Sequence, residues 1–156
     1  MREIIVTGAG GFIGTVLVEQ ALKAGHKVKA IDRYFFGEGV FDDMKSSGRL
    51  NVVRQDIREV TARDLAGADA VIDLAALSND PAGELDPGLT TSINCQGRIN
   101  VVKSAREAGV ARYVVASSCS VYGFNPDVAL TEDSPVNPQT AYARSMVEVE
   151  RMAFDC

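Results

Sequence analysis

Residues 3–14 of this chain read EIIVTGAGGFIG, an apolar run that leads directly into a cluster of glycines. The β-branched residues at positions 4–6 favour a buried strand. Apolar residues at helical spacing then begin at Phe12 and continue to Gly25, a residue type that commonly ends helices. The stretch therefore predicts a strand, a tight glycine-rich turn and a helix over residues 12–24.

The glycines and an acid further along the chain predict a dinucleotide site. Glycine allows the tight turn and the close approach of backbone to a pyrophosphate, and the N-terminus of the following helix offers unpaired N–H groups. Asp32 ends the second apolar run, 18 residues past Gly14. A carboxylate there accepts hydrogen bonds from both ribose hydroxyls and repels a 2′-phosphate, which favours NAD. Arg33 keeps NADP open as the less favoured cofactor, because a guanidinium can hold a 2′-phosphate.

The rest of the chain alternates short β-branched runs with longer helical patterns, which is typical of a parallel α/β sheet covered on both faces. The predicted strands are residues 4–6, 26–31, 52–53, 70–74 and 113–116. The predicted helices are residues 12–24, about 88–108 and about 140 to the end, with a loop or broken helix over 34–50.

Composition excludes several classes of protein. A chain of 156 residues that is 46% hydrophobic and 24% charged fits one globular domain rather than a disordered or coiled-coil protein. The net charge of −5 gives no positive field for nucleic acid or a membrane surface, so we expect neither as a partner. The three cysteines form no CxxC pair, which argues for no metal site, no disulfide framework and a cytoplasmic location.

The ordered motifs resemble those of the extended short-chain dehydrogenase/reductase superfamily, the branch of NAD-dependent epimerases and dehydratases. The spacing Gly8-x-x-Gly11-x-x-Gly14 is similar to the first motif of that family, and later segments are similar to its next motifs in the same order. These segments are Asp56-Ile57-Arg58, Leu74-Ala75-Ala76, Asn94-x-x-Gly97-x-x-Asn100 and residues 117–123 (SSCSVYG). The resemblance implies a Rossmann-type, doubly wound, three-layer α/β/α domain over residues 1–156, with about five strands in the order 3-2-1-4-5.

The resemblance also implies a role for each matching residue. Ser118 would hydrogen-bond the reacting hydroxyl or carbonyl, and Tyr142 would exchange its proton, the two functions that hydride transfer from a carbinol requires. The cofactor-binding residues would be Gly8, Gly11, Phe12, Ile13, Gly14, Asp32, Arg33, Asp56, Ile57, Leu74, Ala75, Ala76, Asn94, Ser117 and Tyr142. The residues facing the substrate would be Ser78, Asn79, Ser118 and Ser120. The resemblance suggests that Asn94 braces the active-site backbone, and the alternative is that Asn94 and Asn100 are plain helix-surface amides.

One position departs from the family pattern. The family has a lysine four residues after its tyrosine, where this chain has Met146. In the family that ammonium activates the tyrosine and hydrogen-bonds the nicotinamide ribose, whereas an isolated phenol is mostly protonated at neutral pH. Arg144 does not substitute, because two residues along a helix turn it ~200° away from Tyr142. The activity is then much reduced, or the lysine was replaced on purpose to trap a ligand, or the protein only binds its cofactor.

The second departure is length, since extended members of the family continue into a substrate-binding domain that this sequence does not contain. We expect an NAD-dependent nucleotide-sugar epimerase or dehydratase that is truncated and impaired. The alternative is a non-catalytic NAD-binding module or sensor subunit. A homodimer, or a partner chain that supplies the missing half, is expected from the resemblance.

Overall fold

The computed structural model describes residues 1–37, 39–78, 80–125 and 129–155, which form one five-stranded parallel sheet. The strands are β1 (Glu3–Thr7), β2 (Lys27–Asp32), β3 (Leu50–Arg54), β4 (Ala70–Asp73) and β5 (Arg112–Val115). Their order in the sheet is β3-β2-β1-β4-β5, with every neighbouring pair parallel. The predicted fold class and strand order are confirmed, and the largest shift in a strand start is at β3, which begins two residues before the prediction.

Helices of several kinds connect the strands. The α-helices are α1 (Phe12–Lys23), α2 (Ala62–Leu65), α3 (Asp80–Leu85), α4 (Pro87–Thr91), α5 (Arg98–Glu107) and α6 (Ala141–Phe154). The other helices are the 3₁₀ segments η1 (Gly39–Ser47), η2 (Ile57–Glu59) and η4 (Cys119–Tyr122), and the π-helical η3 (Ser92–Gly97). Among the described helices, none combines the length and the apolar character needed to cross a membrane.

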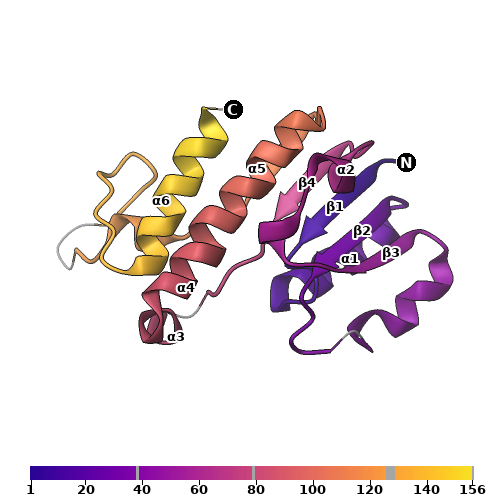
Figure 1. The fold of residues 1–156 in the computed structure, drawn as a ribbon, viewed down its shortest axis with the longest axis horizontal. Helices are drawn as coiled ribbons and strands as arrows, with labels where there is room; N and C mark the ends of the chain where they lie inside the picture. Colours follow the sequence, from indigo (N-terminus) through magenta and orange to yellow (C-terminus); the bar gives the residue numbers. More distant parts are fainter. Residues whose placement is uncertain (38, 79, 126–128, 156) are drawn as a thin grey trace.

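Two hydrophobic cores lie on opposite faces of the sheet, because alternate residues of each strand point to opposite sides. Val6 and Val28 pack with Val18 and Leu22 of α1 on one face. Ile5 and its neighbours pack with α5 on the other face. There α5 and α6 run side by side, as Figure 1 shows. Both faces are therefore covered, as the three-layer prediction requires.

The helix predicted over residues 88–108 is continuous in the structure but changes type along its length. Its middle, η3, is π-helical, a geometry that often accompanies functional sites. Asn94 lies in this segment and is fully buried. Asn100, the third residue of α5, donates from Nδ2 to the carbonyls of Ile57 (3.0 Å) and Val60 (2.8 Å). The reading of the two asparagines as helix-surface amides is therefore wrong, because both hold backbone from another segment.

Two glycines permit the close packing at the turn after β1. Gly8 has a φ of +70°, and a Cβ on it would lie 2.6 Å from the amide nitrogen of Ala75. A Cβ on Gly14 would lie 2.3 Å from the carbonyl oxygen of Gly8 and 2.7 Å from Ala9 Cα. Both neighbours are backbone, so neither can move aside without disturbing the turn.

Gly14→Ala should lower the free energy of unfolding by about 1–3 kcal/mol, because the added methyl group overpacks against fixed backbone. Urea denaturation followed by circular dichroism measures the change. Gly39→Ala is the matched control, since a Cβ there meets nothing closer than Asp42 Oδ2 at 3.4 Å. A Gly14 variant as stable as the control would contradict the packing argument.

Asp56 organises the chain after β3. Its carboxylate caps η2 by accepting from the amide of Arg58 (2.9 Å) and pairs with the guanidinium groups of Arg58 (2.7 Å) and Arg33 (2.6 Å). These contacts, the side-chain hydrogen bond from Arg58 first, hold the pKa of Asp56 well below its usual range. The ionised form is therefore stabilised in the folded state.

Asp56→Asn should lower the free energy of unfolding at pH 7 by about 1 kcal/mol, a modest value because both arginines are partly exposed. Because the pKa of Asp56 is lower in the folded state than in the unfolded state, its contacts stabilise the fold at pH values above the unfolded pKa, which is near 4. That stabilisation is lost as the pH falls below this value. The difference between parent and variant should hold from pH 5 to 8 and shrink below about pH 4. Urea titrations at pH 7 and pH 3 measure it, with exposed Asp43→Asn as control, and a difference that grows in acid would refute it.

Candidate functional site

An open cleft of about 670 Å³ runs along the carboxyl ends of the strands. In a parallel α/β sheet this edge, near the point where the strand order reverses, is where ligands bind. The residues that line the cleft are Gly8, Gly11, Phe12, Ile13, Gly14, Asp32, Arg33, Phe35, Phe36, Gln55, Asp56, Ile57, Leu74, Ala75, Ala76, Leu77, Ser78, Ile93, Arg98, Ala116, Ser117 and Tyr142.

The glycine turn brings the N-terminus of α1 to the middle of the cleft. The N-cap of α1 is Gly11, which has no side chain to bond the first N–H groups, and the first turn contains no acidic residue. Phe12 and Ile13 are largely exposed at the cleft. The backbone N–H groups and the positive end of the helix dipole are thus available to an anionic group such as a pyrophosphate.

Asp32 is fixed in place beside this turn. Its Oδ2 accepts from the amide of Gly10 (3.1 Å) and its Oδ1 accepts from the amide of Tyr34 (2.6 Å). Tyr34 is held in turn by a hydrogen bond from its hydroxyl to the carbonyl of Ala30 (2.8 Å). The carboxylate is therefore presented to the cleft in one orientation, as recognition of ribose hydroxyls requires.

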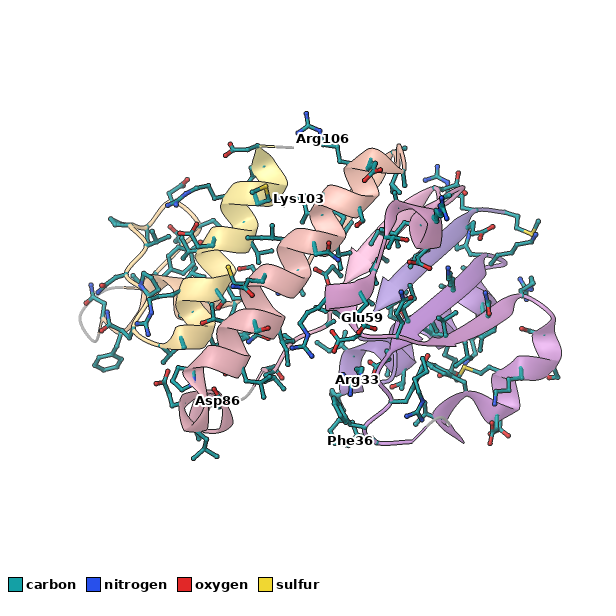
Figure 2. The ribbon with its side chains drawn as sticks, in the orientation of Figure 1. Arg33, Phe36, Glu59, Asp86, Lys103 and Arg106 are labelled. Carbon is teal, nitrogen blue, oxygen red and sulfur yellow. The ribbon has the colours of Figure 1, made fainter. Side chains whose placement is uncertain are left out.

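One end of the cleft is aromatic and charged. Phe35 and Phe36 are both exposed, and the guanidinium carbon of Arg33 lies 5.1 Å from the centre of the Phe35 ring. Arg33 and Phe36 lie next to each other in Figure 2, on the loop after β2. Ile57 adds an apolar contact beside Asp56. This end suits a flat base, which can stack on aromatic rings.

The other end of the cleft joins the segment after β4 to Ser117 and Tyr142. Asn94 holds this segment from behind, because its Oδ1 accepts from the amide of Leu77 (2.8 Å) and its Nδ2 donates to the carbonyl of Leu77 (3.0 Å). Asn94 itself does not line the cleft and so acts through Leu77. Ser78 lines the cleft, and Asn79 lies outside the described residues.

Ser118 and Ser120 bond each other instead of lining the cleft. Ser118 Oγ accepts from the amide of Ser120 (3.2 Å) and from its hydroxyl (2.9 Å), and so caps η4. Ser117, the residue before them, does line the cleft. The Ser118 side chain can adopt another staggered rotamer about its Cα–Cβ bond and so turn its hydroxyl toward a bound ligand, at the cost of this cap.

A buried ion pair lies under this end of the cleft. The Nε of Arg98 lies 3.0 Å from Asp73 Oδ2, and both side chains are buried to within 1% of full burial. The carboxylate also accepts from the hydroxyls of Thr7 (2.5 Å) and Tyr113 (2.7 Å). Burial, reinforced by Asp73, raises the pKa of Tyr113 far above its usual value, so this phenol remains a hydrogen-bond donor.

Sequence reasoning missed this ion pair. An aspartate inside the apolar run of residues 70–74 was the available indication, because a charged side chain in a buried strand requires a partner. Arg98 lies in a helix where the pattern gives no sign of burial. Phe35, Phe36 and Gln55 were missed as well, since they lie in irregular segments whose path the periodicity does not define.

The structure brings together all of the predicted cofactor-binding residues except Asn94. Those that line one cleft are Gly8, Gly11, Phe12, Ile13, Gly14, Asp32, Arg33, Asp56, Ile57, Leu74, Ala75, Ala76, Ser117 and Tyr142. Met146, at the position of the family lysine, is 1% exposed on the inner side of α6. Within the described residues, no cluster of three or more His, Cys, Asp or Glu could hold a metal ion.

Known proteins are similar to this chain in both sequence and fold. A curated UDP-glucose 4-epimerase from Mycolicibacterium smegmatis is 34% identical over 151 residues, which are 94% of this chain and 48% of the epimerase. A solved dTDP-glucose 4,6-dehydratase, DesIV from Streptomyces venezuelae with bound NAD, is 31% identical with a TM-score of 0.89, over 96% of this chain and 50% of the dehydratase. The structure of MoeE5 with UDP-glucose and NAD is 30% identical with a TM-score of 0.85, over 98% of this chain and 48% of MoeE5.

The chain spans about half the length of the curated relatives it matches. The model of the NAD dependent epimerase/dehydratase family matches residues 4–156, which is nearly the whole sequence. The chain therefore belongs to the NAD dependent epimerase/dehydratase family.

Proposed function

We propose that this chain binds NAD and forms the cofactor-binding part of a nucleotide-sugar epimerase or dehydratase. The observation that carries the proposal is Asp32, clamped by two backbone amides beside the unobstructed N-terminus of α1. The carboxylate that would bind the ribose hydroxyls therefore lies beside the helix N-terminus that would bind the pyrophosphate, as a dinucleotide requires. A side chain at Gly8 or Gly14 would collide with backbone. Without side chains at these positions, the backbone of the turn can approach a pyrophosphate closely.

The arrangement of charges favours NAD over NADP. Arg33, the side chain that could hold a 2′-phosphate, is engaged by Asp56 at 2.6 Å and stacks on Phe35. A carboxylate at Asp32 would repel a 2′-phosphate on the ribose that it binds. Binding of NADP would therefore require Arg33 to leave its partner and the phosphate to approach a carboxylate.

The residues of the chain would divide the work in the following way. Phe35, Phe36 and Ile57 would enclose the adenine, and the amides of α1 would bind the pyrophosphate. Tyr142 would take the proton from the reacting hydroxyl, and Ser118 would hydrogen-bond the same oxygen after rotating away from Ser120. Bound NAD would supply the hydride acceptor and later the hydride donor.

The sugar-recognition part of the site would come from polypeptide that this sequence does not include. The chain covers about half the length of relatives such as the UDP-glucose 4-epimerase. MoeE5 binds UDP-glucose in its solved complex, which supports a nucleotide sugar as the substrate class. Ser78, Asn79 and Ser120 would contribute the substrate contacts of this chain.

The assembly and the compartment belong to the proposal as well. A homodimer, or a partner chain that completes the site, rests on the resemblance to the family. The two described cysteines, Cys95 and Cys119, form no disulfide, and this supports a reducing compartment such as the cytoplasm.

A non-catalytic NAD-binding module is the second candidate. Met146 supports it, because a thioether at this position can neither carry a charge nor donate a hydrogen bond. The two candidates share the cofactor and differ only in whether hydride is transferred.

Calorimetry with NAD and NADP tests the cofactor. We expect NAD to bind at least about tenfold more tightly than NADP, and Asp32→Ala to weaken NAD binding about tenfold, because a charge-assisted hydrogen bond to the ribose is lost. Asp42→Ala, which changes an exposed carboxylate of η1, should leave the affinity for NAD unchanged. Equal affinities for NAD and NADP, or an Asp32 variant that binds like the parent, would rule out the proposed role of Asp32.

Absorbance at 340 nm separates the two candidate functions. When UDP-glucose or dTDP-glucose is added to the NAD-saturated chain, a stopped-flow measurement should show a transient rise in absorbance, because the reduced cofactor later returns its hydride. Tyr142→Phe should slow that rise about 10²- to 10⁴-fold, because the proton acceptor is removed while most cofactor contacts remain. Ser118→Ala should act in the same direction. A rise that Tyr142→Phe abolishes would contradict the non-catalytic module, whereas the lack of a rise supports that module only in a polypeptide that also contains the sugar-recognition part.

A further inference from the structure

Arg98 is the one cationic side chain among the described residues that lines the cleft at its serine and tyrosine end. The other arginine of the lining, Arg33, lies at the aromatic end. Arg98 is 1% exposed, yet it shares the cleft wall with Ala116, Ser117 and Tyr142. A buried cation at the wall of a ligand cleft calls for a role beyond packing.

The geometry holds Arg98 in one orientation. Its Nε donates to Asp73 Oδ2 (3.0 Å), and its Nη2 donates to the carbonyls of Asp73 (3.0 Å) and Ala116 (2.8 Å). One N–H of Nη1 donates to the sulfur of Met146 (3.0 Å). Guanidinium has five N–H donors, and among the described residues the second N–H of Nη1 has no acceptor. The guanidinium is therefore fixed on one side and retains a donor beside Met146.

Met146 and Arg98 exclude a second cation at this point. Met146 lies one helical turn after Tyr142, so both side chains are on the same side of α6. A lysine at position 146 would place its ammonium within a few ångströms of the Arg98 guanidinium, and like charges at that distance in a buried site repel strongly. The neutral thioether, a weak acceptor, is compatible with the guanidinium.

We propose that Arg98 replaces the missing lysine as the cation of this site, and that its free Nη1 donor binds the nicotinamide-side ribose of NAD. The cation then lies on α5, whereas the family lysine lies at the position of Met146 on α6. The neutral Met146 avoids a repulsion between two cations. The proposal rests on the proposed NAD binding. It also accounts for a hydrogen-bond donor at this end of the cleft without a lysine at 146.

The test compares ligands that do and do not contain the second ribose. ADP carries the adenosine and the diphosphate only, whereas ADP-ribose and NAD add the ribose that Arg98 would bind. Calorimetry on Arg98→Gln should show roughly tenfold weaker binding of ADP-ribose and NAD, with unchanged affinity for ADP. A merely structural role of Arg98 would affect all three ligands equally.

Variants that place the cation at position 146, at position 98 or at both positions provide the matched controls. Met146→Lys alone should weaken NAD binding, because it adds a second cation, and should not improve it. In the Arg98→Gln/Met146→Lys double variant the cation returns to α6, and NAD affinity should recover to within about threefold of the parent. If Arg98→Gln does not fold because Asp73 loses its partner, Asp73→Asn/Arg98→Gln replaces the ion pair with a neutral pair for the same ligand series.

The outcomes separate this proposal from the proposed function. Arg98 variants that bind ADP-ribose and NAD like the parent, or that lose ADP equally, overturn the role of Arg98 while NAD binding stands. An improvement of NAD binding by Met146→Lys alone also overturns it. If the parent chain binds neither ADP nor NAD, both the proposed NAD binding and the proposed role of Arg98 are wrong.

Discussion

The buried pair of Asp73 and Arg98 joins the parts of this protein on which the cleft depends. Asp73 ends β4 beside the central strand, and Arg98 begins α5, so their contact fixes the helix against the sheet. The guanidinium also holds the carbonyl of Ala116 after β5 and the sulfur of Met146 on α6. Removing one partner of such a pair commonly costs about 3–5 kcal/mol, because the other charge is left buried alone. One cation thereby sets the relative position of β4, β5, α5 and α6.

The rest of the cleft is built by backbone rather than by charge. At the turn after β1, the packing of Gly8 against Ala75 brings the carboxyl ends of β1 and β4 together. Asp32 then closes the opposite side by accepting from Gly10 across the turn. Asn94, buried in the π-helical segment, fixes the position of the segment after β4 by hydrogen bonds to the N–H and the C=O of Leu77. The cleft is therefore largely preformed, which lowers the entropy cost of ordering a ligand.

Much of the fold could be predicted from the sequence because its strands are short, β-branched and separated by helical patterns. The parallel sheet, its strand order and most element bounds followed from those patterns together with the family resemblance. The cofactor-binding residues on the first turn and at strand ends were also predictable, since the carboxyl ends of parallel strands meet at one edge. Asn94 and Ser118 were less predictable. Whether an amide bonds a ligand or backbone, and which way a hydroxyl turns, depends on neighbours distant in sequence.

The sequence by itself determined the α/β architecture, the dinucleotide-type turn and the absence of a lysine at position 146, because each is a matter of residue type and spacing. Only the tertiary structure decided what takes the place of that lysine. Arg98 and Met146 are 48 residues apart and lie on different helices, and no local pattern links them. Their contact exists because Asp73 needs a buried cation and because α5 and α6 pack side by side on one face of the sheet (Figure 1).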